Sequence, residues 1–268
     1  MKNIKQIIIA FVCCIVSVAH AQEQVELFTV PLSEPGNKGK LELGQIKGSI
    51  SVVGYDGNEI IVKATLEERK TRNSDAGKGM KRIANSSLSI SAEERNNVVQ
   101  IINEQHNRKT DLEIKVPKNF DLRLSTVNKG DIIVEGVQGE MEISNVNGEI
   151  TLKDISGSAS ADTTNGDIKV VFNSITENTS MAFSSFQGDI DITFPESLKA
   201  NVKMRSDMGE IFTDFDMAIE DKKLTVETNS NSDTRKISLE QWVKGKINGG
   251  GAEMLFKTWQ GDIMIRSN

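Results

Sequence analysis

The chain has 268 residues, with 32 basic and 38 acidic side chains and a net charge of −6 at pH 7. An acidic chain lacks the basic surface that non-specific binding to nucleic acid or to an anionic membrane requires, so neither is an expected partner. Both cysteines, Cys13 and Cys14, lie in the first 21 residues. Residues 22–268 can therefore form no disulfide, thiol nucleophile or cysteine-ligated metal site.

Residues 1–21 are typical of a secretory signal peptide. Lys2 and Lys5 precede the apolar segment 7–18, and Ala19–Ala21 supplies small residues for cleavage. The apolar segment is too short to span a bilayer comfortably, although an uncleaved anchor is the alternative. We predict export to the periplasm, the outer-membrane surface or the medium, with no integral membrane segment after cleavage.

The following residues alternate between short apolar strands and polar turns. Strands are predicted at 50–52, 60–64, 88–91, 98–102 and 112–116. Two polar stretches interrupt this pattern, near 69–87 and near 233–251, and are predicted to be inserted surface loops. We therefore expect a single domain over residues 22–268.

A repeated motif dominates the second half of the sequence. It consists of a polar pair, Gly, an acid, Ile, any residue and usually an aliphatic residue. Gly130, Gly148 and Gly166 are 18 residues apart, and the next spacings are longer. The copies occupy residues 126–134, 145–152, 163–170, 185–192, 206–213 and 258–265, with a looser copy at 45–52.

Each part of this motif has a physical meaning. Gly adopts positive φ without steric cost and so turns the chain. The alternating aliphatic residues after it form one face of a half-buried strand. One unit cannot bury that face alone, whereas stacked units align it into a continuous core. We therefore predict an all-β fold, a parallel β-solenoid or β-helix of about 18–22 residues per coil. An antiparallel β-sandwich is the alternative.

Several of these segments, taken in order, also resemble a known family. Residues 112–117, residues 122–126, the tandem Gly–acid–Ile units and the closing segment 249–266 are similar to the bacterial "putative adhesin" β-strand-repeat proteins of unknown function. The resemblance covers roughly residues 40–268. It implies a β-solenoid and an extracytoplasmic location, and it brings no established catalytic residues.

The acids of the motif are the main candidates for chemistry. They could form a ladder of oxygen ligands for Ca²⁺. Alternatively, each is a turn residue that is solvated or accepts a backbone N–H. Their spacing differs from the dense nonapeptide of calcium-binding β-rolls, which favours the second interpretation. The six acids are Asp131, Glu149, Asp167, Asp189, Glu210 and Asp262.

Other residues offer little chemistry. His106 is the single histidine after the signal peptide and lies in a polar stretch, so no histidine triad or multi-histidine site can form. Phe186, Trp242 and Trp259 are expected to fill the core or cap the stack, with exposed binding aromatics as the alternative. The sequence predicts no catalytic, cofactor-binding or metal-binding residue, and no cofactor.

The resulting hypothesis is a non-enzymatic exported protein that contacts an envelope or surface protein or glycan, as an adhesin or scaffold does. Two alternatives stay open. Acidic side chains on a β-helix could serve a carbohydrate-active enzyme, or the protein could be an accessory in envelope signalling.

Overall fold

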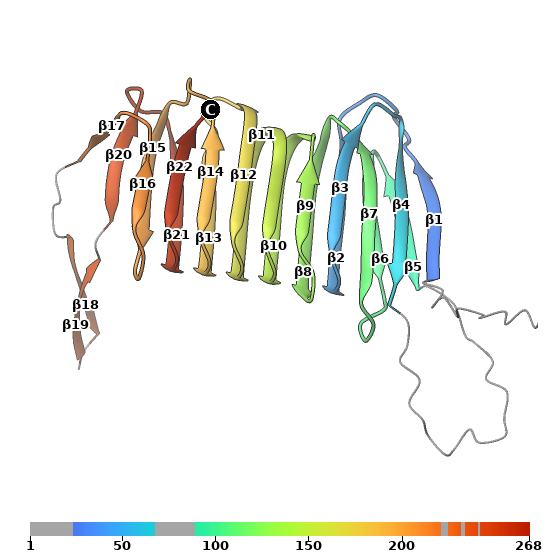
Figure 1. Cartoon of the computed structure of the whole chain (residues 1–268), viewed down its shortest axis with the longest axis horizontal. Coiled ribbons are helices and arrows are strands. Elements are labelled where there is room, and N and C mark those ends of the chain that lie inside the picture. Colours follow the sequence, from blue (N-terminus) through green and yellow to red (C-terminus); the bar gives the residue numbers. More distant parts are fainter. Residues whose placement is uncertain (1–23, 68–88, 221–224, 232–233, 241) are drawn as a thin grey trace, which may run out of the picture.

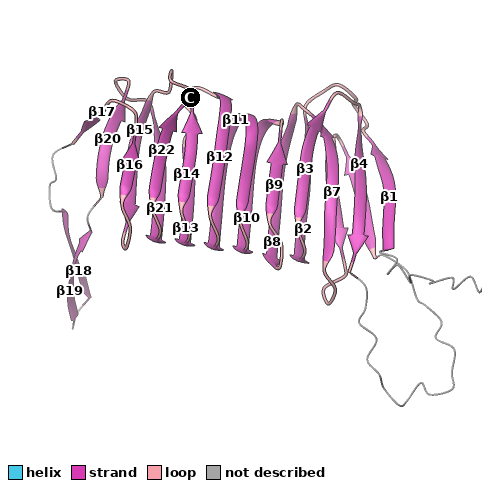
Figure 2. Cartoon of the chain, in the orientation of Figure 1, coloured by secondary structure: helices cyan, strands magenta, loops and turns pink. Residues whose placement is uncertain are grey.

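A computed structural model describes residues 24–67, 89–220, 225–231, 234–240 and 242–268. The predicted signal peptide at 1–21 and the predicted loop at 69–87 lie outside these ranges. The described residues contain strands and turns but no helix, and so no helix that could cross a membrane. The all-β class predicted from the sequence is confirmed (Figure 2).

The strands follow one another with short connections. In chain order they are β1 (Gln24–Pro31), β2 (Gly39–Lys47), β3 (Ile50–Tyr55), β4 (Glu59–Leu66), β5 (Ile90–Arg95), β6 (Val98–Asn103), β7 (Thr110–Pro117), β8 (Phe120–Asn128), β9 (Ile132–Glu135), β10 (Gln138–Asn147), β11 (Ile150–Asn165), β12 (Ile168–Ile175), β13 (Met181–Gln187), β14 (Ile190–Phe194), β15 (Ala200–Ser206), β16 (Ile211–Thr213), β17 (Met217–Ile219), β18 (Thr225–Asn231), β19 (Thr234–Glu240), β20 (Val243–Ile247), β21 (Ala252–Gln260) and β22 (Ile263–Ser267).

Strand pairing arranges most of these strands in two long rows. Row A has the order β5-β6-β2-β8-β10-β11-β13-β21-β15-β20-β17. Row B has the order β1-β4-β7-β3-β9-β11-β12-β14-β22-β16. The long strand β11 belongs to both rows, and β18 and β19 pair only with each other among the described strands.

The sheet is mixed. Pairing is parallel through the middle of both rows, which does not fit the antiparallel sandwich considered above. It is antiparallel where β1, β4 and β5 close one end, and where β17 and β20 lie at the other. The antiparallel strands therefore add a feature that the repeat motif did not predict.

The predicted 18-residue period is visible in the register. Ile132 lies opposite Ile150, and Ile150 lies opposite Ile168. The apolar residue after each turn continues this line along row B, and all its members except Ile211 are at most 1% exposed. The line consists of Leu112, Ile50, Ile132, Ile150, Ile168, Ile190, Ile263 and Ile211.

Aromatic side chains fill the core towards the C-terminal half. Phe172 stacks on Phe194 with ring centroids 5.1 Å apart, and Phe183 stacks on Phe256 at 5.6 Å. All four rings are fully buried. Burial of side chains this large contributes about 1.5–3 kcal/mol each, so the two rows are held together by one continuous apolar core.

Spatial order departs from chain order at both ends. Strands β2 and β3 lie between β6–β7 and β8–β9, and strands β21 and β22 lie between β13–β14 and β15–β16. Figure 1 shows the last strands, in dark red, between strands coloured yellow to orange. The final copy of the motif is therefore an inner layer of the stack and not its end.

The predicted polar loop at 233–251 differs from the structure. Strands β19 and β20 lie within this range, and β20 joins row A by antiparallel pairing with β15 and β17. The polar residues misled the interpretation because alternate residues of β20, Lys244 and Lys246, face solvent on a sheet with one open face. Among the described residues of this range, a turn is found around Gly249 and Gly250, both at positive φ.

Candidate functional site

The Gly–acid turns form one edge of the molecule, and their acids serve the fold. In four layers, interrupted by the layer of Glu149, the carboxylate Oδ1 accepts the backbone N–H of the residue after Gly in the next layer, at 2.8–3.0 Å. These acceptors are Asp131, Asp167, Asp189 and Asp262, and the donors are Glu149, Asp189, Asp262 and Glu210.

The two glutamates of the motif behave differently. Glu149 pairs with Lys169 at 3.5 Å, and this lysine also contacts Asp167 at 3.3 Å. Glu210 lies in the outermost layer of row B. The structure thus gives the aspartates the backbone-accepting role considered in the sequence. Among the described residues no cluster of carboxylates and histidines is suited to hold a metal ion.

The motif glycines are required by close approach and, except at Gly130 and Gly209, also by a positive φ. Gly188 has φ of 146°, and a Cβ placed there would lie 2.0 Å from the carbonyl oxygen of Gly166. That oxygen also accepts the hydroxyl of Ser185 at 3.1 Å. Side chains three residues before Gly repeat this bond in other layers, so each turn is fixed to its neighbour.

The outer face of row A is the other candidate surface, because every second side chain of its strands points away from the core. Three lines of outward side chains cross the central strands at right angles to them. The first line is Glu42, Arg123, Glu142, Ser160, Ala182 and Leu255. The second is Gly44, Ser125, Ser144, Asp162, Ser184 and Lys257. The third, nearest the turns, is Ile46, Val127, Val146, Thr164, Phe186 and Trp259.

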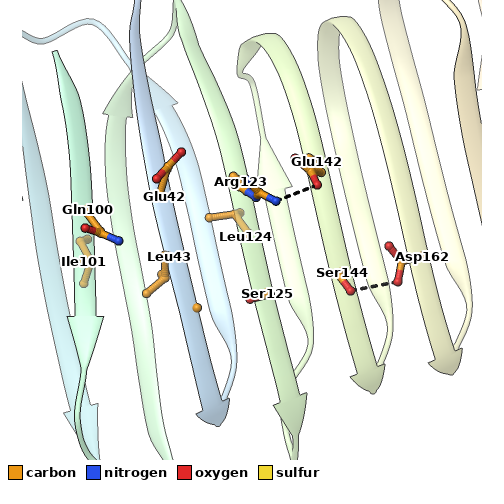
Figure 3. Close-up of a pocket in the computed structure, with 11 residues that line it drawn as sticks. Glu42, Leu43, Gln100, Ile101, Arg123, Leu124, Ser125, Glu142, Ser144 and Asp162 are labelled. Atoms are coloured by element: carbon orange, nitrogen blue, oxygen red, sulfur yellow. Dashed lines mark hydrogen bonds and ion pairs between the residues drawn. The ribbon is translucent and has the colours of Figure 1, made fainter. Parts of the chain in front are cut away.

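A shallow depression of about 500 Å³ lies over the first two lines between β6 and β11 (Figure 3). Its floor is low because Gly44, Ser125 and Ser144 carry small side chains or none. Charged groups border it: Arg123 pairs with Glu142 at 3.3 Å, and Ser144 donates to Asp162 at 2.9 Å. These side chains can hydrogen-bond a polar ligand lying across the strands.

Glu42 completes this border. Lys40 lies 2.8 Å from it, and the hydrogen bond from the lysine lowers the pKa of the Glu42 carboxyl, with smaller help from Arg123. The carboxylate is therefore ionised and partnered. It is suited to accept hydrogen bonds and not to supply a proton as a general acid.

The third line is an apolar ridge. Phe186 is 56% exposed and Trp259 is 46% exposed, and their rings stack 6.2 Å apart with 5° between the planes. Ile46, Val127 and Val146 continue the ridge with 37–40% exposure. The expectation that these two aromatics fill the core or cap the stack is wrong: position 186 and position 259 face outward because the residues before them, Ser185 and Thr258, face inward.

Cations gather beyond the ridge on β15, β20 and β21. Lys203 lies opposite Lys244, and Arg205 lies opposite Lys257. Trp242 is half-buried and packs under Lys203, whose Nζ lies 4.4 Å from the ring centroid. Sequence reasoning missed this cluster because its members are distant in the chain and meet only through the pairing of β15 with both β20 and β21.

His106 lies in the turn between β6 and β7, and its side chain is exposed as its polar neighbours indicated. It stands apart from the depression, the ridge and the cations of row A. No described contact of its imidazole ring indicates a ligand.

Together, the repeated turns, the buried aliphatic lines and the open outer face define a β-repeat protein with an extended contact surface. Residues 123–248 match the family model described as Toastrack DUF4097. This match supports, over residues 123–248, the resemblance recognised from the motifs to an adhesin-like family of unknown function.

Comparison with solved structures gave distant similarities. A putative cell adhesion protein from Clostridium sporogenes is 12% identical, with a TM-score of 0.47, over 92% of this chain and 100% of the other. A putative adhesin from Bacteroides fragilis is 10% identical, with a TM-score of 0.38, over 91% and 97%. Both TM-scores lie below 0.5, so no inference rests on them. Comparison with curated proteins gave no match.

Proposed function

We propose that the protein is an exported, non-enzymatic parallel β-solenoid that makes adhesin-like or scaffolding contacts at the cell envelope. The observation that carries this proposal is the stacked, exposed pair of Phe186 and Trp259 on the outer face of row A. Exposed aromatics on a regular surface are costly for solubility and are typical anchors of binding interfaces.

Other features support an interaction role. Neighbouring strands lie about 4.8 Å apart, so the ridge presents one side chain per layer along a straight line. Solenoids use such lines as extended binding faces. The charged groups bordering the depression are already paired with one another, which suits recognition better than proton transfer.

The signal-peptide pattern of residues 1–21 supports export. Contact with the cell envelope is therefore consistent with the export suggested by residues 1–21 and with the exposed outer face of row A.

Sedimentation with envelope fractions of the producing cell tests the proposal. The mature chain is expected to co-sediment, and the double variant Phe186→Ser with Trp259→Ser is expected to bind about tenfold more weakly or worse. The matched control is Ile133→Ser with Val171→Ser, two apolar side chains on the outer face of row B that are 39% and 37% exposed. The proposal is overturned if the wild type stays in solution, or if both double variants bind like it.

A further inference from the structure

The strongest unexplained feature is a basic patch on the outer face of row A. It consists of Lys203, Arg205, Lys244, Lys246 and Lys257, on the neighbouring strands β15, β20 and β21 (Figure 1). The chain as a whole is acidic, with a net charge of −6. A concentration of cations on one part of one face therefore departs from the average surface.

The register of the strands makes this patch unfavourable by itself. Lys203 and Lys244 are directly opposite in an antiparallel pair, and Arg205 and Lys257 are directly opposite in a parallel pair. Like charges opposite one another destabilise a sheet, whereas opposite charges at the same positions would stabilise it. Glu220 lies opposite Lys244 on its other side and offsets part of this repulsion. The two like-charged pairs still give no advantage to folding, which points to a role outside folding.

Little in the described part of the chain neutralises the patch. Arg205 forms an ion pair with Asp207 at 2.7 Å. Lys203 packs on Trp242, and the remaining three lysines form no ion pair with any described residue. A depression of about 380 Å³ lies between the lysines, with Glu220 and Glu253 also on its border. Three of the five cations, Lys203, Lys244 and Lys246, thus border a hollow that an anionic group can enter.

The aromatic ridge ends at the same place. Trp259 follows Lys257 by two residues on β21, so both side chains point outward roughly 7 Å apart along the strand. Phe186 stacks beside Trp259 on the adjacent strand β13. Apolar ring surface and positive charge therefore occur together across four neighbouring strands.

From this juxtaposition we infer that the basic patch and the Phe186–Trp259 pair bind an acidic polysaccharide that lies across the strands. Its carboxylates contact the lysines, and the apolar faces of its sugar rings pack on the aromatic side chains. This inference rests on the proposed function and names the ligand class of the same face. A polymer fits better than a single small anion because the cations are spread over three strands, about 10 Å across.

Apolar ring faces distinguish this ligand from other anionic polymers. A sugar acid carries an apolar ring face beside each carboxylate, which matches the positions of Trp259 and Lys257, two residues apart on β21 and next to Phe186. The headgroups of a lipid surface present no such ring faces to the stacked aromatic pair.

Titration calorimetry of the mature chain with alginate, a polymer of sugar acids, tests the inference. Wild type is expected to bind alginate, more weakly as salt is raised, and not to bind the neutral polymer dextran. Lys244→Glu is expected to weaken binding about tenfold and to change the melting temperature little, because it makes the pair with Lys203 attractive and the pair with Glu220, which follows β17, repulsive. Lys115→Glu, an exposed lysine on β7 opposite Val53 and Ile61, makes the same charge change on row B and is expected to leave binding unchanged.

The inference is overturned by no binding of alginate, by equal binding of dextran, or by equal binding of alginate by Lys244→Glu and wild type. Binding to phosphatidylglycerol vesicles in place of alginate would also overturn it, as would binding of polyglutamate as tight as alginate that is unaffected by Trp259→Ser. If alginate fails but envelope sedimentation still depends on Phe186 and Trp259, only this inference fails. If sedimentation fails as well, the proposed function falls with it.

Discussion

The backbone N–H of Asp262 donates to Oδ1 of Asp189, 73 positions earlier in the chain, at 2.8 Å. Between these residues the chain builds β15 to β20 and then returns to place β21 and β22 inside the stack. The last copy of the motif therefore lies between two layers that precede it in the sequence. Stability of the C-terminal half depends on residues at the very end of the chain.

Phe256 carries this dependence, because its ring packs on Phe183 at 5.6 Å and meets Phe194 edge-on at 6.4 Å. Phe256→Ala is expected to lower the free energy of unfolding by about 3–5 kcal/mol, since it leaves a cavity. Phe186→Ala makes the same change on an exposed ring and is expected to cost about 0.5 kcal/mol. Urea denaturation followed by circular dichroism measures both, and similar losses would contradict the assigned core.

Gly188 tests the close approach of the turns. Gly188→Ala places Cβ against the carbonyl oxygen of Gly166, so the turns must separate in addition to adopting a strained φ. Gly36→Ala is the control, because φ there is 88° and no atom lies within 4 Å of the new Cβ. The control is expected to cost about 1–2 kcal/mol, the strain alone, and Gly188→Ala clearly more. Equal melting temperatures for the two variants would refute the close-approach argument.

The structural role of the turn acids is tested at Asp189. Asp189→Ala leaves the N–H of Asp262 without its acceptor and is expected to cost about 1.5–3 kcal/mol. Glu196→Ala, an exposed acid without a described side-chain partner, is expected to change stability by less than about 0.5 kcal/mol.

The effect of Ca²⁺ on thermal stability is a second test of the turn carboxylates. If the carboxylates serve the backbone, the melting midpoint of the wild-type protein is expected to be unchanged by millimolar Ca²⁺. A rise in the midpoint that Asp189→Ala removes would restore the calcium-ladder interpretation.

Glu42 gives a pH-dependent prediction. Because Lys40 lowers its pKa in the folded state, the carboxylate adds stability that is present above its unfolded pKa and is lost as the pH falls through the folded value. Lys40→Met is expected to raise the Glu42 pKa towards its ordinary value, as followed by carboxyl chemical shifts in a pH titration. The control Lys199→Met, on a lysine without an ion pair among the described residues, is expected to leave that pKa in place, and an unchanged Glu42 pKa in both variants would remove the lysine as the cause.

The sequence alone determined the local rules of this protein. Each Gly–acid–Ile unit predicts a turn and a strand with one buried face, because positive φ and period-two alternation are properties of a few adjacent residues. The 18-residue spacing predicted that Ile132, Ile150 and Ile168 meet, and they do. Residues with one strong local preference could be placed without knowledge of their partners.

Tertiary structure decided the order of the layers and the content of the outer face. The local sequence does not determine that Ile263 lies between Ile190 and Ile211, because each layer has the same aliphatic positions and the same turn. Outward positions carry no folding constraint, so Phe186, Trp259 and the opposed Lys203 and Lys244 could be interpreted only after the strands were placed side by side. Identical layers fix how a coil packs, whereas the chain's path through the stack fixes which side chains share a surface.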